Sequence, residues 1–237
     1  MTRLFLWAFL APAAEPSFDV ASLKPSAPLE LGQNYNANLG TARFGEVTLS
    51  NATLVDCIKF AYGLASDEQV SGPDWVKSKE VRFEIAAKAA ASTPRDQLLL
   101  MLRSLLAERF HLVMHTEPRA MVHYSLVVGK NGSKMKAVEP DPANSHMTYR
   151  IASITHNQIS MGTLAMLLSR QMRELVLDET GLKGAYEIKL EWKPDADDTG
   201  PTVFSAVQDQ LGLKLESRKG PVDVMVIDRV DRTPVGN

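Results

Sequence analysis

The sequence predicts an α+β fold, an internal duplication of one helix–strand–helix–hairpin unit whose helices pack on a largely antiparallel sheet. Three observations predict it. Apolar residues recur at helical spacing in several segments, and shorter runs between these segments alternate apolar and polar residues as strands do. The order of the segments in the first half of the chain returns in the second half. Because each unit is small, we expect two of them to bury their apolar faces against each other or to share one sheet.

The first half of the chain shows each element of the unit in turn. In the first helix Asn51 is a candidate N-cap and Gly63 a candidate stop, and Thr93 is the candidate N-cap of the second helix. The segment after the second helix alternates on both sides of a charged turn containing proline, which predicts a hairpin. In chain order we expect a strand at 17–26, a helix at 51–63, a strand at 80–88, a helix at 93–110 and a hairpin at 110–129.

The second half repeats this order. Its apolar helix faces start at Leu164 and Phe204, a separation close to that between Leu54 and Leu98 in the first half. The expected elements are a helix at 160–172, a strand at 180–193, a short helix at 202–212 and a closing hairpin at 213–230. The alternative is a coincidental similarity between two ordinary α+β segments.

The N-terminus predicts export. Arg3 precedes a short apolar run, and Ala11 to Ala13 fit a small-x-small cleavage site, so residues 1–13 read as a signal peptide. The apolar stretch is well short of the roughly 20 residues that span a bilayer, so the chain is not expected to span a membrane once the leader is removed. A disordered or buried N-terminal segment is the alternative.

The remaining domain boundaries follow from the repeat and from a polar stretch between its two copies. We expect a first α+β unit with its N-terminal strand at 14–130, a connector at 131–147 and a second α+β unit at 148–237. The expected location of the mature protein is periplasmic or extracellular.

Charge and cysteine content exclude some classes of function. Lysine and arginine number 26 against 28 acidic residues, so no basic excess is present to neutralise phosphates, and nucleic acid is not an expected partner. Cys57 is the single cysteine, which rules out an internal disulfide.

The histidines are the first candidates for chemistry. His111 and His115 are four residues apart, a spacing that suits zinc on a helix. Here they lie in an alternating strand, where that spacing places them about 13 Å apart, too far for one ion. His123 is expected on the partner strand of the hairpin, where it could approach one of them. Since no third ligand is evident, we predict no metal site and no cofactor.

Two further strings resemble catalytic or metal-binding motifs in composition only. Ser133 to Lys136 match S-x-x-K, but they follow a polar loop instead of opening a helix. Residues 195–200 begin like a calcium loop, yet its twelfth position is Ala206 where a glutamate is required. We therefore assign no catalytic residue.

Four residues are candidates for binding a partner. Trp75 and Arg119 lie in predicted turns, and exposed aromatic and arginine side chains are favoured at binding sites. His115 and His123 complete the set. A core position for Trp75, a solvated turn for Arg119 and ordinary polar strand faces for the histidines are the alternatives.

With these segments in place, the chain resembles the Acidobacterial soil-associated protein family, a domain of unknown function. The matching stretches are FDVASLKPS, GPDW, LLAERFHLVMH, YSLVVGKNGSKMK, DETGLKGAYEIKLEW and QLGLKLESRKGPVDVMVID, which extend from about residue 18 to 230. The resemblance implies export. Related domains follow membrane metallopeptidases of the BlaR type, and this chain has no such peptidase segment, so a signalling role would need a separate partner.

A second resemblance concerns the layout of each half. The segments TLAMLLSRQM, GLKG and TVFSAVQDQLGLKLESRKGPVDVMVI are similar in order to the short N-terminal domains of secretins and TonB-dependent receptors. Those modules make protein–protein contacts in the periplasm.

The sequence therefore favours a non-enzymatic module that binds an envelope protein or a cell-wall component. The alternative is a hydrolase or envelope sensor whose dispersed site lies near His115 and His123.

Overall fold

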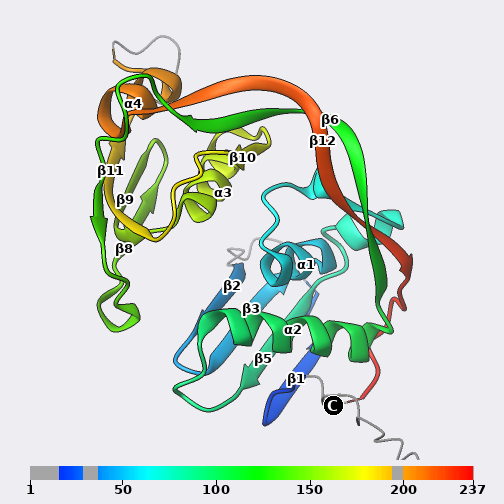
Figure 1. Ribbon diagram of the computed structural model, residues 1–237. Coiled ribbons are helices and arrows are strands. Elements are labelled where there is room, and N and C mark those ends of the chain that lie inside the picture. The colour runs from blue at the N-terminus through cyan, green and yellow to red at the C-terminus, as the bar shows by residue number, and fades with distance from the viewer. Residues whose placement is uncertain (1–15, 29–36, 194–199, 237) are drawn as a thin grey trace, which may run out of the picture.

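The protein forms two lobes joined by two long strands (Figure 1). The structure is a computed structural model that describes residues 16–28, 37–193 and 200–236, so the predicted signal peptide at 1–13 lies outside the described residues. This part of the chain contains four α-helices and three four-stranded, mostly antiparallel sheets. None of its helices has the length and apolar character needed to cross a membrane.

The first lobe is a four-stranded antiparallel sheet with two helices on one face. The sheet order is β1-β5-β3-β2, and α1 and α2 cover the face on which the apolar side chains lie. The elements are β1 (Val20–Pro25), β2 (Asn38–Arg43), β3 (Glu46–Ala52), α1 (Leu54–Tyr62), η1 (Asp67–Gln69), β4 (Val70–Ser71), η2 (Asp74–Lys77), β5 (Phe83–Lys88) and α2 (Arg95–Phe110).

Local capping sets the ends of α1, whereas the predicted cap of α2 is wrong: Pro94, and not Thr93, is its N-cap, and no side chain there accepts a hydrogen bond from the helix. Thr53, and not the predicted Asn51, caps α1: its side chain accepts the N–H of Asp56, while the Asp56 carboxylate accepts the N–H of Thr53. Asn51 instead belongs to β3, with a left-handed φ of 52°. Gly63 ends α1 in the left-handed conformation, as predicted.

The second lobe also contains a four-stranded antiparallel sheet and two helices. Its sheet order is β7-β11-β9-β8, and buried residues of α3 and α4 share a core with this sheet. The stretch 131–147, predicted as a connector, contains β7 and η3. The elements are β7 (Lys136–Val138), η3 (Pro142–Asn144), β8 (Met147–Arg150), β9 (Ser153–Ile159), α3 (Met161–Met172), β10 (Val176–Asp178), β11 (Ala185–Glu191) and α4 (Val203–Leu211).

The predicted hairpins at 110–129 and 213–230 are wrong. Each segment is one long strand, β6 (Val113–Val128) and β12 (Leu213–Arg229), and the two pair with each other in antiparallel register. We call this pair the ribbon. Its sheet order is β10-β6-β12-β4, and β10 and β4 each add a short parallel strand to one end.

The prolines that suggested turns fit within straight strands because of where their nitrogens point. The backbone N–H of Tyr124 in β6 donates to the Leu175 carbonyl on the β10 side, and therefore points away from β12. Backbone N–H directions alternate along a strand, so the nitrogen of Pro118, six residues earlier, also points away from β12. Pro221 lies opposite Ala120, at a position of the same kind on β12. Neither proline therefore removes a hydrogen bond from the ladder, and both block further strand pairing at an open edge.

The ribbon completes both hydrophobic cores. Leu126 of β6 is fully buried in the core of the second lobe, together with Leu213 and Leu215 of β12. At the opposite end, Ile227 of β12 is buried in the core of the first lobe, beside Met114 of β6. Each lobe is thus closed by one strand from each half of the chain.

Truncating Leu126 tests this exchange. Leu126→Ala should lower the free energy of unfolding by about 2–5 kcal/mol, because it leaves a cavity in a packed core. Urea unfolding measures this loss, and hydrogen exchange should show that the protection of α3 and α4 falls more than that of α1. Val122→Ala on the same strand, where Val122 is 63% exposed, is the control and should change stability by less than about 0.5 kcal/mol. Equal effects of the two substitutions would contradict the packing.

Candidate functional site

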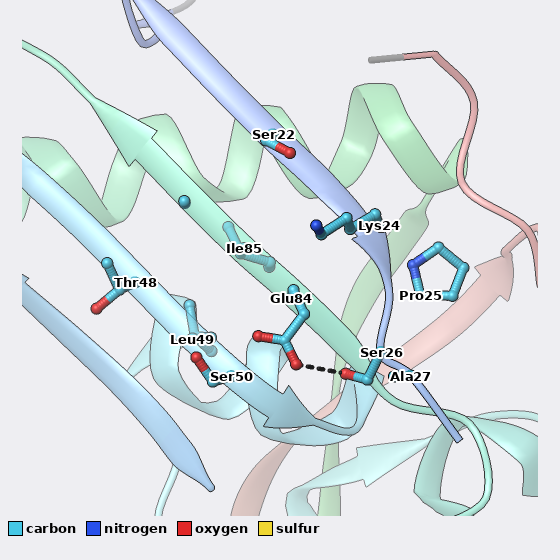
Figure 2. A pocket seen from close by; sticks show the side chains of 11 residues that line it. Ser22, Lys24, Pro25, Ser26, Ala27, Thr48, Leu49, Ser50, Glu84 and Ile85 are labelled. Atoms are coloured by element: carbon cyan, nitrogen blue, oxygen red, sulfur yellow. Dashed lines mark hydrogen bonds between the residues drawn. The ribbon is translucent and has the colours of Figure 1, made fainter. Parts of the chain in front are cut away.

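The first sheet exposes one face to solvent, on the side away from α1 and α2. This face, which we call the first open face, is hollowed into a shallow cavity of about 720 Å³ lined by β1, β3 and β5. Figure 2 looks onto it, with α2 behind the sheet. This cavity is larger than the one on the sheet of the second lobe.

Strand alternation places polar side chains on this face. Leu23, Leu49 and Ile85 turn toward the helices and are buried. Their neighbours along each strand therefore point the other way: Ser22 and Lys24 from β1, Thr48 and Ser50 from β3, Glu84 and Ala86 from β5.

The register of the strands makes the hollow. Ser22, Ala86 and Thr48 stand opposite one another on neighbouring strands and form a floor of small side chains. On one side of this row Lys24 stands opposite Glu84. On the other side Val20, Lys88 and Glu46 form a row of larger side chains, in which the Lys88 ammonium lies 2.8 Å from the Glu46 carboxylate. The two flanking rows are about 13 Å apart along the strands.

The Glu84 carboxylate is the most tightly held polar group of the first open face. One of its oxygens accepts the Ser26 hydroxyl at 2.7 Å and the backbone N–H of Asn51 at 2.9 Å. Burial by itself raises the pKa of this carboxyl. The hydrogen bonds from Ser26, Asn51 and Ser50, and the positive charge of Lys24, outweigh that effect, so the pKa of Glu84 lies below its usual 4.5. The group is therefore an ionised acceptor at neutral pH.

The second lobe carries a smaller hollow on its own exposed sheet face, which we call the second open face. Thr155 stands between Lys189 of β11 and Thr148 of β8, and the cavity has a volume of about 330 Å³. Asn157 and Glu187 also line it. At its border, partial burial lowers the pKa of His156, whose Nδ1 accepts the N–H of Gln158 at 3.0 Å.

The structure does not bring the candidate histidines together. The expectation that His123 crosses a hairpin to reach His115 is wrong, since both lie on β6, eight residues and about 26 Å apart. His115 is exposed, and its Nδ1 is 2.9 Å from both carboxylate oxygens of Asp228 on β12. His123 is buried, with Nε2 3.6 Å from Glu179.

Arg119 and Trp75 also occupy separate places. Arg119 lies inside β6 and not in a turn, because the hairpin is replaced by the ribbon, and its guanidinium donates to Glu117 at 3.0 Å. Trp75 lies in η2, is partly buried and packs against the core of the first lobe.

A cluster that sequence reasoning missed surrounds Glu179, just after β10. Its carboxylate accepts the hydroxyl of the buried Ser125 at 2.8 Å and pairs with Arg218 of β12. Glu179 therefore links the second lobe to both strands of the ribbon, to β6 through Ser125 and to β12 through Arg218. Because Ser125 is fully buried, this arrangement serves packing and offers a substrate no access to the hydroxyl. Glu179 lies in the DETGLKG segment, part of a stretch that carries the family resemblance, and this was the feature of the sequence that could have drawn attention to it.

Neither open face brings together a set of metal ligands. In the ranges that the structure describes, histidine, cysteine and acidic residues nowhere gather in a group of three or more suited to a metal ion. The chemistry that the open faces offer is hydrogen bonding by hydroxyl, amide and carboxylate groups.

Fold and site define a two-lobed mixed α/β protein with an exposed polar sheet face on each lobe. The chain belongs to the family of proteins of unknown function DUF3738, whose model matches residues 55–230. Comparison with curated proteins and with solved structures finds no match.

The lowered pKa of Glu84 predicts a pH-dependent contribution to stability. A carboxyl whose pKa is lower in the folded state stabilises the fold above its unfolded pKa, and this contribution is lost as the pH falls through the folded pKa. Glu84→Gln should therefore lower the free energy of unfolding near neutral pH. Its difference from the wild type should shrink below about pH 4.5. Chemical denaturation at a series of pH values measures this, with the exposed Glu80→Gln as control. A difference that does not change with pH would contradict the assignment.

Proposed function

We propose that the protein is an exported, non-enzymatic module that binds another envelope protein or a cell-wall component through its exposed sheet surface. The observation that carries this proposal is the first open face. It presents hydroxyl groups, an ionised carboxylate and an ammonium group to solvent from three strands of a rigid sheet. Such an arrangement can hold a ligand by hydrogen bonds without any reacting group of its own.

The export part of the proposal is supported by the sequence. The N-terminal signal-peptide pattern and the resemblance to the Acidobacterial soil-associated family both favour an envelope location. The layout shared with the short N-terminal domains of secretins and TonB-dependent receptors favours a binding role. Cell fractionation that places the mature protein in the cytoplasm would contradict this location.

The binding role is favoured over the hydrolase or sensor alternative by the placement of the histidines. His115 and His123 lie far apart on one strand, and His123 is buried, so the two do not form one solvent-open site. A turnover that is measured for the purified protein and lost in His115→Ala would overturn the non-enzymatic proposal.

We also infer that the two lobes arose by internal duplication. The order β3-α1-β4-β5-α2-β6 in the first half corresponds to β9-α3-β10-β11-α4-β12 in the second. The sheet orders β1-β5-β3-β2 and β7-β11-β9-β8 correspond strand for strand, and β4 and β10 flank opposite ends of the ribbon. The repeating unit therefore ends in a long strand and not in a hairpin. An experimental structure whose lobes do not superpose in this order would remove the basis of the inference.

Co-sedimentation tests the binding role. The purified protein should sediment with an insoluble cell-envelope fraction of its source organism. It should remain bound when the salt concentration is raised to about 0.5 M, because uncharged hydrogen-bonding side chains outnumber lysine and glutamate in both cavities and screening affects them little. An envelope fraction treated with protease separates a protein partner from a cell-wall component. A protein that stays in the supernatant with both fractions would contradict the proposal.

A further inference from the structure

We propose that the two open faces are paired binding sites for a neutral linear glycan, a polymer of hydroxyl- and amide-bearing sugar units. This inference rests on the proposed binding function and names its ligand class. It is carried by the chemistry of the two cavities and by their occurrence on both lobes of one chain.

The first open face has the groups that a sugar chain requires. Hydroxyl groups both donate and accept hydrogen bonds, and Ser22 and Thr48 supply them on the floor, with Ser50 beside them. The ionised Glu84 adds an acceptor, and Lys24 on the neighbouring strand adds donors. The floor runs across the strands between two rows about 13 Å apart, which leaves room for an extended chain.

The second open face repeats this set of groups with different residues. Thr148 and Thr155 stand opposite each other on neighbouring strands and supply hydroxyl groups, and Asn157 adds an amide. Glu187 and Lys189 again add one acidic residue and one lysine, and His146 and His156 also line this cavity. Each cavity is therefore lined by hydroxyl groups together with one carboxylate and one ammonium.

This chemistry favours a glycan over a peptide and over a polyanion. Peptide partners bind most tightly where large apolar or aromatic anchors fill desolvated pockets. The floor of the first open face carries small polar side chains and Ala86 instead. A polyanion would be matched by a surplus of positive charge, whereas each cavity is lined by one lysine and one glutamate.

The presence of two such faces on one chain favours a repeating polymer. Linking two weak sites makes the second binding event intramolecular and raises the overall affinity by about 10²–10⁴-fold when one ligand reaches both. A glycan strand offers the same units repeatedly along its length, so one polymer can supply both contacts. The ribbon connects the two lobes and holds the two faces on one molecule.

Substitutions that fill each floor test the inference. Ala86→Arg introduces a long side chain at an exposed position on the first open face, and Thr148→Arg does so on the second. Ala120→Arg, at an exposed position on the ribbon, is the matched control. Circular dichroism and thermal unfolding of the full chain should show that all three variants fold as the wild type does.

Calorimetry with a short N-acetylglucosamine oligosaccharide should show two sites in the wild type and in Ala120→Arg. One site should remain in each single floor variant and none in the double variant. On insoluble cell-wall glycan strands freed of protein, either single floor variant should bind about 100-fold more weakly than the wild type, because the second contact is lost.

The remaining outcomes separate this inference from the proposed function. Glycan binding that the floor substitutions leave unchanged would overturn the assignment of the site and leave a binding module. Retention by untreated envelope, lost after protease treatment and without affinity for glycan, would overturn the ligand class alone. Absence of binding to envelope and glycan alike would overturn both.

Discussion

The antiparallel pairing of β6 with β12 is the constraint on which both lobes depend. The two strands run past each other from Leu213 opposite Val128 to Ile227 opposite Met114, and each enters both hydrophobic cores. Loss of this pairing would open one side of each core, since Leu126 and Ile227 would leave their apolar surroundings. The fold of each lobe is thus coupled to the fold of the other through main-chain hydrogen bonds.

The same strand alternation that builds the cores leaves the opposite sheet faces polar and solvent-exposed. In each lobe the helices cover the apolar face, and serine, threonine and charged side chains occupy the other. Helices on both faces would require apolar residues on both sides of every strand, which these strands do not have. The open faces are therefore a consequence of the sequence pattern, and they provide the surface on which the proposed binding rests.

Local patterns were sufficient to predict the four helices and three of the short strands, β1, β5 and β11. The apolar stripes predicted α1, α2, α3 and α4 within a few residues, because helical periodicity depends on neighbours in sequence. The hairpins were wrong for the opposite reason. Pro118, Pro221 and their charged neighbours are typical of turns, but the structure is decided by pairing between residues about 100 positions apart in the sequence. No local pattern reports such a partner.

The candidate site was harder to predict than the fold. Trp75, His115, Arg119 and His123 stand out by residue type, and the structure disperses them. The floor of the first open face consists of Ser22, Thr48 and Ala86, residues of common types that form a site only because the strand register places them in one row. Strand order and register come from long-range pairing, so a single sequence read element by element does not reveal this row.

A cross-link within the ribbon is the most direct measurement of the central claim. Thr116 and Met225 stand directly opposite each other, at a pair whose backbone hydrogen bonds point outward, where Cα atoms lie about 4.5 Å apart and a disulfide fits. The doubly substituted chain Thr116→Cys, Met225→Cys, with the buried Cys57 replaced by alanine, should form an intramolecular disulfide under mild oxidation. The pair Thr116→Cys, Ser217→Cys should not, because Ser217 lies opposite Tyr124. Failure of the first pair to cross-link, with a disulfide instead in Thr116→Cys, Met121→Cys, would indicate local hairpins and contradict the ribbon.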